Sequence, residues 1–186
     1  KVASIDIETN QKHDKIYSIS IYTKGFKKTL IISDKKLKNA VSCKDESELL
    51  RTFKDKILQL DPDVITGWNV IDFDLKVIKE RMKQHHIPFM IGRASWPCKL
   101  RLSTSFFTSS KADIPGRVVL DGIELLKNAF IKLDNYKLDT AAEKYAKEKK
   151  LIGEKDKGAA IDKAFKHDKQ KLADYNLKDS ELVDKV

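Results

Sequence analysis

Hydrophobic and polar residues alternate through the first part of the chain, and a period of two is typical of β-strands. The alternating runs cover residues 2–7, 16–22 and 28–32, they are rich in β-branched residues, and Lys24-Gly25 separates the last two. This pattern predicts three strands joined in an antiparallel meander.

After residue 45 the hydrophobic residues recur at intervals of three and four, which is the period of an amphipathic helix. Asp45 and Glu48 form a capping-box pattern before the first such run, and Asp61-Pro62 stops it. Strands followed by helices, with a meander in front, indicate an α/β or mixed α+β domain of three layers. The remaining patterns predict strands over 63–66 and 118–120, and helices over 46–60, 72–85, 122–130, 138–150 and 168–185.

The stretch 88–116 has the weakest pattern, because prolines and clusters of Ser and Thr interrupt it. Apolar and polar residues alternate over 100–106, which hints at a strand or a hairpin. Phe106-Phe107 lies between basic residues and could stack on DNA bases. An ordinary core strand is the more frequent explanation of such a pair.

The composition bounds the class of protein. A chain of 186 residues suits one domain, at ~100–200 residues per domain, and we expect a single domain over 1–186. With 41% hydrophobic and 35% charged residues the chain is too apolar to be disordered. It has no apolar run of the ~20 residues that a membrane span needs, and no signal-peptide pattern. Cys43 and Cys98 stand alone, which excludes a secreted disulfide scaffold and indicates an intracellular protein.

The formal net charge is +9, from 37 Lys and Arg against 28 Asp and Glu. A basic excess favours a polyanionic partner such as nucleic acid. Lysine runs such as residues 147–150 are also typical of a solvated helix surface. Charge alone therefore does not identify a function.

Four acidic residues stand where an ordinary protein seldom places them. Asp6 and Glu8 are two apart on the first predicted strand, so both side chains leave the same face, where like charges repel unless a cation lies between them. Asp74 and Asp179 lie on two of the predicted helices, each on a face that also carries core residues. A buried carboxylate is costly unless it is paired, protonated or bound to a metal. The four together predict a site for Mg²⁺ or Mn²⁺, which prefer oxygen ligands.

Tyr175 precedes Asp179 by four residues, which places a phenol one helical turn from a predicted ligand. A phenol in that position can orient a reacting water by hydrogen bonding. A single Tyr on an apolar helix face is more often a packing residue, so the neighbouring carboxylate is what favours the functional interpretation.

Three motifs in this order resemble those of the DEDD 3′–5′ exonucleases. Asp6-Ile7-Glu8-Thr9 resembles the first motif, and Asn69-Val70-Ile71-Asp72-Phe73-Asp74 resembles the second in its family B DNA polymerase form. Tyr175-Asn176-Leu177-Lys178-Asp179 resembles the third, in the variant that defines the tyrosine branch. Each motif alone is weak, whereas three in the right order through one domain form a specific signal.

The resemblance extends over essentially the whole chain. Residues 61–65, 67–70 and 121–124 are similar to the proofreading exonuclease domain of family B DNA polymerases, most of all to the bacterial DNA polymerase II group. Nothing in the chain resembles a polymerase motif. We therefore expect a ribonuclease-H-like exonuclease fold, with a mixed central sheet and flanking helices, cut from a longer DNA polymerase.

The resemblance also implies roles for individual residues. Tyr175 would orient the attacking water. Thr9, Asn69 and Phe73 match family positions that contact a single-stranded 3′ end. The ligands of two divalent metal ions, Mg²⁺ or Mn²⁺, would be Asp6, Glu8, Asp74 and Asp179.

The expected activity is that of a proofreading 3′–5′ exodeoxyribonuclease, which releases nucleoside 5′-monophosphates from the single-stranded 3′ end of DNA. The expected partners are that DNA end and the polymerase and N-terminal domains of the parent chain, with no membrane. The domain itself is expected to be monomeric and its location to be the cytoplasm, at the nucleoid. Two alternatives stay open, an exoribonuclease of the ribonuclease D type and a catalytically silent nucleic-acid-binding module of a polymerase.

Overall fold

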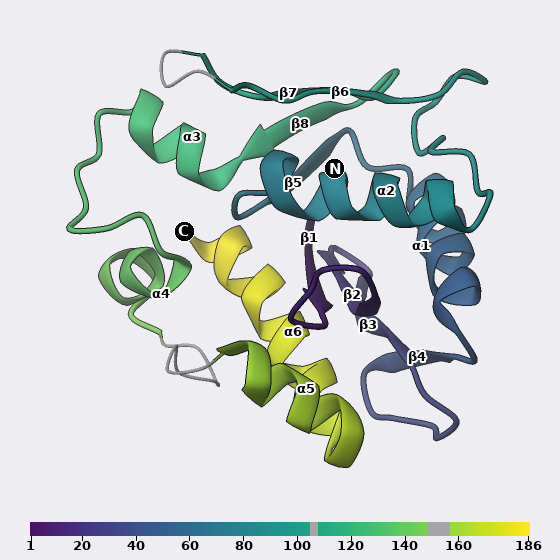
Figure 1. Cartoon of the computed structure of the whole chain (residues 1–186). Coiled ribbons are helices and arrows are strands. Elements are labelled where there is room, and N and C mark those ends of the chain that lie inside the picture. The colour runs from purple at the N-terminus through teal and green to yellow at the C-terminus, as the bar shows by residue number, and fades with distance from the viewer. Residues whose placement is uncertain (105–107, 149–156) are drawn as a thin grey trace.

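The computed structural model describes residues 1–104, 108–148 and 157–186 (Figure 1). Its centre is a six-stranded sheet in the order β4-β3-β2-β1-β5-β8. β1, β2 and β3 pair antiparallel, whereas β4, β5 and β8 each join a neighbour in parallel, so the sheet is mixed as predicted. The six strands are β1 (Val2–Thr9), β2 (Ile16–Thr23), β3 (Phe26–Ile32), β4 (Ala40–Cys43), β5 (Val64–Gly67) and β8 (Val118–Asp121).

Helices cover both faces of this sheet, which gives the three layers (Figure 1). On one face α1 packs against β2, β3 and β4, and α2 packs against α1. On the other face α6 crosses β1, β2 and β3, with α5 beside it. A hairpin of β6 (Lys99–Arg101) and β7 (Lys111–Asp113) forms a second, two-stranded sheet. The helices are α1 (Glu46–Leu60), α2 (Lys76–Gln84), α3 (Gly122–Asn128), α4 (Leu138–Ala141), α5 (Lys157–His167) and α6 (Lys169–Lys185), with π-helical turns η1 (Ile71–Leu75) and η2 (Ala142–Ala146).

The two faces of β1 have different chemistry. Ile5 and Ile7 are buried in the main core, which includes Leu49 and Phe53 of α1. Successive strand residues point to opposite faces, so the even-numbered residues of β1 point toward α6. The acidic residues of the strand therefore lie between the sheet and α6, away from the main core.

The predicted meander, the helix over 46–60 and the strand at 118–120 are confirmed, and the expected α/β class is confirmed with them. At the start of α1, the Asp45 side chain accepts a hydrogen bond from the Glu48 amide, as the capping pattern predicts. The alternation near residue 100 corresponds to β6. None of the described helices combines the length and apolar composition of a membrane span.

Three features differ from the sequence prediction. The strand β4, which has only four residues, was not predicted. The helix α5 was not predicted either, because it offers only Ile161 and Phe165 as large apolar residues. The predicted helix over 138–150 was too long: helical structure ends at Ala146, and Lys147 takes the left-handed conformation with φ of 55°. The last two residues of that predicted helix and the Phe106-Phe107 pair lie outside the described residues.

Candidate active site

Three of the predicted ligands come together between the sheet and α6. Asp6 and Glu8 point from β1 toward α6, which contributes Asp179. One carboxylate oxygen from each of the three lies within 4.8 Å of the other two. Glu8 and Asp179 are 4% and 1% exposed, and Asp6 is half-buried. Three carboxylates this close, in a buried setting, form an oxygen donor set that suits a divalent cation.

Small polar side chains on the sheet let α6 approach closely enough to complete this cluster. The Ser20 hydroxyl donates to the carbonyl oxygen of Asn176 at 2.9 Å, and the Thr29 hydroxyl donates to that of Ala173 at 2.7 Å. Both bonds join a strand directly to the helix backbone. Larger side chains at these strand positions would push α6, and with it Asp179, away from β1.

Asn176 holds the Asp6 carboxylate in place. Its side-chain nitrogen donates to Asp6 Oδ2 at 2.6 Å and to the Asp6 carbonyl oxygen at 3.1 Å, and its side-chain oxygen accepts from Ser18 at 2.8 Å. Asn176 is fully buried with its polar atoms paired. The sequence analysis placed this residue inside the third motif but gave it no role, because the contact joins segments 170 residues apart.

Asp74 reaches β1 from η1, the π-helical turn that follows β5. It lies on η1, where the amide of Leu75 bonds to the carbonyl of Val70, and such π-helical turns are frequent at functional sites. Its carboxylate, which is 2% exposed, accepts a 2.9 Å hydrogen bond from the amide of Ile7. Asp74 is thus fixed at the residue between Asp6 and Glu8, but it is not a member of the cluster within 4.8 Å.

Gly67 makes this approach of η1 to β1 feasible. β1 pairs with β5 only as far as Ser4, and β5 ends at Gly67. A Cβ atom on Gly67 would lie 2.7 Å from the carbonyl oxygen of Ile5 and 2.8 Å from a methyl carbon of Val70. A larger residue at this position would therefore displace the turn that carries Asp74.

The electrostatics of the site disfavour ionised carboxylates in the absence of a cation. Burial raises the pKa of Asp6 well above its ordinary value, and the neighbouring Asp179, Asp74 and Glu8 raise it further. Burial also raises the pKa of Asp74, although the Ile7 amide partly offsets this, and Glu8 adds to the increase. A group of acids that repel one another when ionised is stabilised by a bound divalent cation, so the residues present fit the predicted metal.

Tyr175 lies beside the cluster. Its side chain is fully buried, and its hydroxyl interacts with the carboxylate of Asp179. Burial, followed by the charge of Asp179, raises the pKa of the phenol, which therefore stays protonated. A protonated hydroxyl beside the Asp179 carboxylate lies where it can also contact a water or a ligand that enters the site.

Lys157 is a further charged residue of the site, and the sequence analysis missed it. It begins α5, its ammonium lies 3.4 Å from Glu8 Oε1, and it lies 5.4 Å from the centre of the Tyr175 ring. The charges of Glu8, Asp6 and Asp179 raise its pKa against the opposing effect of burial. One more lysine among many gave no signal in the sequence, since only the fold brings α5 to β1.

The residues predicted to contact DNA lie in two places. Thr9 and Phe73 line a cavity of about 430 Å³ that also includes Glu8 and Lys157. Asn69 is exposed, with φ of 59°, and its carbonyl oxygen accepts from the Phe73 amide at the start of η1. It is not among the described residues that line this cavity. The structure therefore brings Thr9 and Phe73 to the acidic cluster, and leaves Asn69 at the turn before η1.

Comparison with known proteins gives the same picture. Residues 1–141 match the family described as DNA polymerase family B, exonuclease domain. The chain is 34% identical over 200 residues to DNA polymerase II of Escherichia coli (strain K12), covering 100% of this chain and 24% of that protein. It is 28% identical over 153 residues to the DNA polymerase delta catalytic subunit of Caenorhabditis elegans, covering 77% of this chain and 14% of the relative.

The chain thus spans about a quarter of the length of the first of these relatives and less of the second. The mixed sheet with helices on both faces agrees with the ribonuclease-H-like exonuclease fold expected for such a match. Because the match covers most of the chain and the structure has the corresponding fold, this chain belongs to the exonuclease-domain family of the family B DNA polymerases.

Proposed function

We propose that this chain is a 3′–5′ exodeoxyribonuclease that uses two divalent metal ions and removes nucleoside 5′-monophosphates from a single-stranded DNA 3′ end. The observation that carries the proposal is the cluster of Asp6, Glu8 and Asp179, whose oxygens lie within 4.8 Å of one another beside the buried hydroxyl of Tyr175. Membership of the family supports it, as does the net charge of +9, which favours a polyanionic substrate.

The residues of the site have different proposed roles in hydrolysis. Mg²⁺ or Mn²⁺, when bound, supplies the Lewis acidity that such phosphodiester hydrolysis needs. The Tyr175 hydroxyl, which stays protonated, orients the attacking water by a hydrogen bond. Lys157 adds positive charge where the phosphate must lie. The proposed metal ligands are Asp6, Glu8, Asp74 and Asp179.

The substrate side of the site is the cavity beside Glu8. Thr9 and Phe73 line it, and Phe73 is available to stack on a base. We propose Asn69 as a contact to the strand outside this cavity, because it is exposed at the neighbouring turn. The proposal includes proofreading for the polymerase domain of a longer parent chain, of which 1–186 is a single, monomeric domain located at the nucleoid.

The deciding experiment measures release of nucleotides from a single-stranded DNA labelled at its 3′ end, in Mn²⁺ and in EDTA. We expect metal-dependent release of 5′-monophosphates from DNA, and loss of that release in Asp179→Asn. Faster cleavage of the matching RNA would favour the ribonuclease alternative. DNA binding with no release in Mn²⁺ or Mg²⁺ would favour the silent-module alternative and would overturn the proposal.

A further inference from the structure

The loop between β1 and β2 places an imidazole at the edge of the catalytic cavity. His13 lies in this loop with φ of 56°, and its amide donates to the Asn10 carbonyl oxygen at 3.0 Å. The Asn10 side-chain oxygen accepts from the amides of Asp14 at 3.1 Å and Lys15 at 3.2 Å. These bonds give the short loop a defined shape, so the exposed His13 side chain starts from a fixed backbone.

Thr9 and Phe73 hold the ring of His13. His13 Nδ1 lies 2.8 Å from the Thr9 hydroxyl, which itself donates to the Asn10 carbonyl oxygen at 3.0 Å. Because a hydroxyl has one proton to donate, Nδ1 is the donor to Thr9, and in the neutral ring Nε2 is an acceptor. The rings of His13 and Phe73 have centres 5.0 Å apart and meet at 88°.

The two perpendicular rings form a corner, and both line the cavity of about 430 Å³ that contains Glu8. Aromatic rings at right angles offer one face for stacking and one edge for contact. A flat heterocycle fits such a corner, since it can stack on one ring while its rim meets the other. The Thr9 hydroxyl is engaged with His13 and Thr9 is only 7% exposed, so this residue acts on a ligand mainly through His13.

We propose that His13 is a positioning residue for the nucleobase at the 3′ end, which it holds together with Phe73. This inference rests on the proposed function and adds a specific contact to it. Loss of His13 removes one side of the corner and the perpendicular contact to the Phe73 ring. The carboxylates of the acidic cluster are unchanged. The effect should therefore appear in the binding of the terminal base and not in the chemical step.

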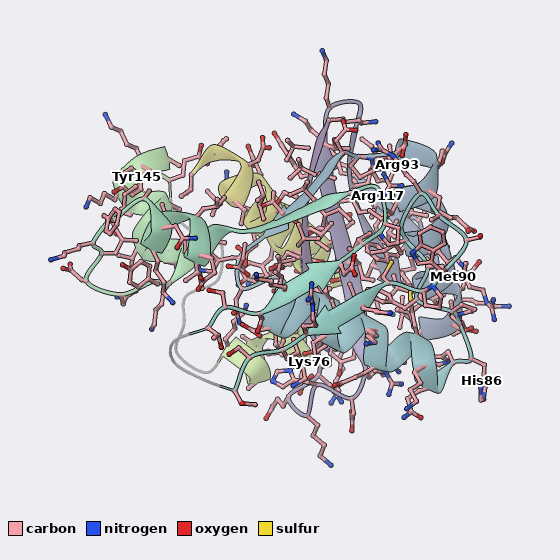
Figure 2. All side chains as sticks on the ribbon, turned by 90° about the horizontal axis from the view of Figure 1, so that it is seen from above. Lys76, His86, Met90, Arg93, Arg117 and Tyr145 are labelled. Carbon is pink, nitrogen blue, oxygen red and sulfur yellow. The ribbon has the colours of Figure 1, made fainter. Side chains whose placement is uncertain are left out.

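The test uses His13→Asn, because Asn tolerates the left-handed backbone of this position. His86→Asn is the matched control: His86 is also exposed and left-handed, with φ of 54°, and follows the far end of α2. In Figure 2 it projects from the edge of the molecule, well separated from Lys76, which follows η1. Two single-stranded DNAs are compared, identical except that one ends in a normal 3′ nucleotide and the other in an abasic one.

Binding is measured by fluorescence anisotropy with Ca²⁺, which replaces the catalytic ions. We expect His13→Asn to weaken binding of the normal end about 3- to 10-fold, the scale of one aromatic contact. Binding of the abasic end should not change, and His86→Asn should bind both like the wild type. Combined with Phe73→Leu, the His13→Asn effect should shrink, since the two rings form one site.

An equal loss on the normal and abasic ends would show that His13 supports the loop and not the base, and would overturn the inference. No loss on either end would overturn it as well. The outcome is separable from that of the proposed function, because nucleotide release in Mn²⁺ tests hydrolysis alone. Base-dependent binding without nucleotide release would support the positioning role of His13 and contradict the proposed nuclease activity.

Discussion

A single buried carboxylate, Glu46, and the acidic cluster beside α6 have opposite electrostatics. At the start of α1, Glu46 is 6% exposed and accepts hydrogen bonds from Arg81, from the His85 ring and from the amide of Ile16, at 2.7–2.9 Å. Burial alone would raise its pKa, but these bonds outweigh burial, and the pKa is lowered. This carboxylate joins α1, α2 and β2, and it is fully satisfied by the protein itself.

The acidic cluster beside α6 has the opposite arrangement. Asp6 receives a bond from Asn176, but its other neighbours are mainly carboxylates, and its pKa is raised. Among the described residues, Lys157 forms an ion pair with Glu8, and its side chain is 43% exposed. The fold therefore surrounds Glu46 with donors, whereas at the cluster it brings acids together, with Lys157 as a partial counter-charge. The first arrangement stabilises the fold, and the second prepares a site.

The largest expected effect is the loss of activity in Asp179→Asn. This change keeps the shape of the side chain and removes one charge from the cluster. Nucleotide release should fall by about 1000-fold or more, equivalent to ~4 kcal/mol of the barrier, because the proposed metal site loses one of its anionic ligands. Thermal stability in EDTA should be unchanged or higher, since a repulsion is relieved.

Asp184→Asn, at an exposed position on the same helix, is the control and should behave like the wild type. Near wild-type release in Asp179→Asn would show that hydrolysis does not need the Asp179 carboxylate.

Asp74 needs a different substitution, because its carboxylate accepts a hydrogen bond from the Ile7 amide. Asp74→Asn keeps an acceptor there, whereas Asp74→Ala leaves a buried amide unpaired and should cost about 1–3 kcal/mol of stability.

The second effect concerns Tyr175→Phe. The ring and its packing remain, and only the hydroxyl beside Asp179 is removed, so stability should fall by no more than about 1 kcal/mol. Release of nucleotides should fall about 10- to 1000-fold, the scale of one positioned hydrogen-bonding group. Binding of DNA in Ca²⁺ should match the wild type. If release is also unchanged, Tyr175 is a packing residue and the tyrosine-branch mechanism does not apply.

The parts of this site that the sequence predicted are those with a local pattern. Asp6 and Glu8 share a face through the strand period, and Tyr175 and Asp179 share one through the helix period. The parts it did not predict depend on contacts between distant segments. Asn176 meets Asp6 across 170 residues, and outside the site the partners of Glu46 likewise lie 30 to 39 residues away from it.

The elements of the fold that the sequence predicted also have strong local patterns, and those it did not predict have weak ones. The meander and α1 have strong periods and local turn or capping residues. α5 begins with Lys157-Gly158 and carries small alanines, so its amphipathic pattern is weak, and its place is set by packing of Ile161 and Ala164 against the α6 side of the sheet. Tertiary packing here decides what local propensity does not.

The third prediction tests the satisfied carboxylate. Glu46→Gln places an amide NH₂ against the Arg81 and His85 donors, so stability should fall by about 2–3 kcal/mol. Because the pKa of Glu46 is lowered below its ordinary 4.5, its contribution is present above about pH 4.5 and is lost as the pH falls through the folded value. The difference between wild type and variant should therefore shrink in acid.

Urea unfolding at pH 7 and at pH 3 measures this difference, with the exposed Asp55→Asn of the same helix as control. Nucleotide release per folded molecule should stay at the wild-type level, since Glu46 does not line the catalytic cavity. Equal stability of wild type and Glu46→Gln at pH 7 would mean that the Glu46 bonds only balance the cost of burying the charge.

The smallest expected effect concerns Lys157, which partly compensates the charge of the cluster through its ion pair with Glu8. In the wild type, Mn²⁺ at ten times its Kd should stabilise the protein by ~1.4 kcal/mol, a rise of roughly 3–6 °C in Tm, because the unfolded chain does not bind it. Lys157→Met keeps a long side chain near the Tyr175 ring and removes the charge.

Without metal, Lys157→Met should lose no more than ~1 kcal/mol of stability, since the Lys157 side chain is 43% exposed and solvent screens the contact. With metal, the variant should gain more than the wild type, because the cation no longer competes with an ammonium 3.4 Å from Glu8. Lys163→Met, exposed on the same helix, is the control and should show the wild-type gain. Equal metal-induced rises in Tm for Lys157→Met and the wild type would show that Lys157 does not balance the charge of the cluster, and that its ion pair with Glu8 differs from the bonds of Arg81 and His85 to Glu46, which lower the pKa of that carboxyl.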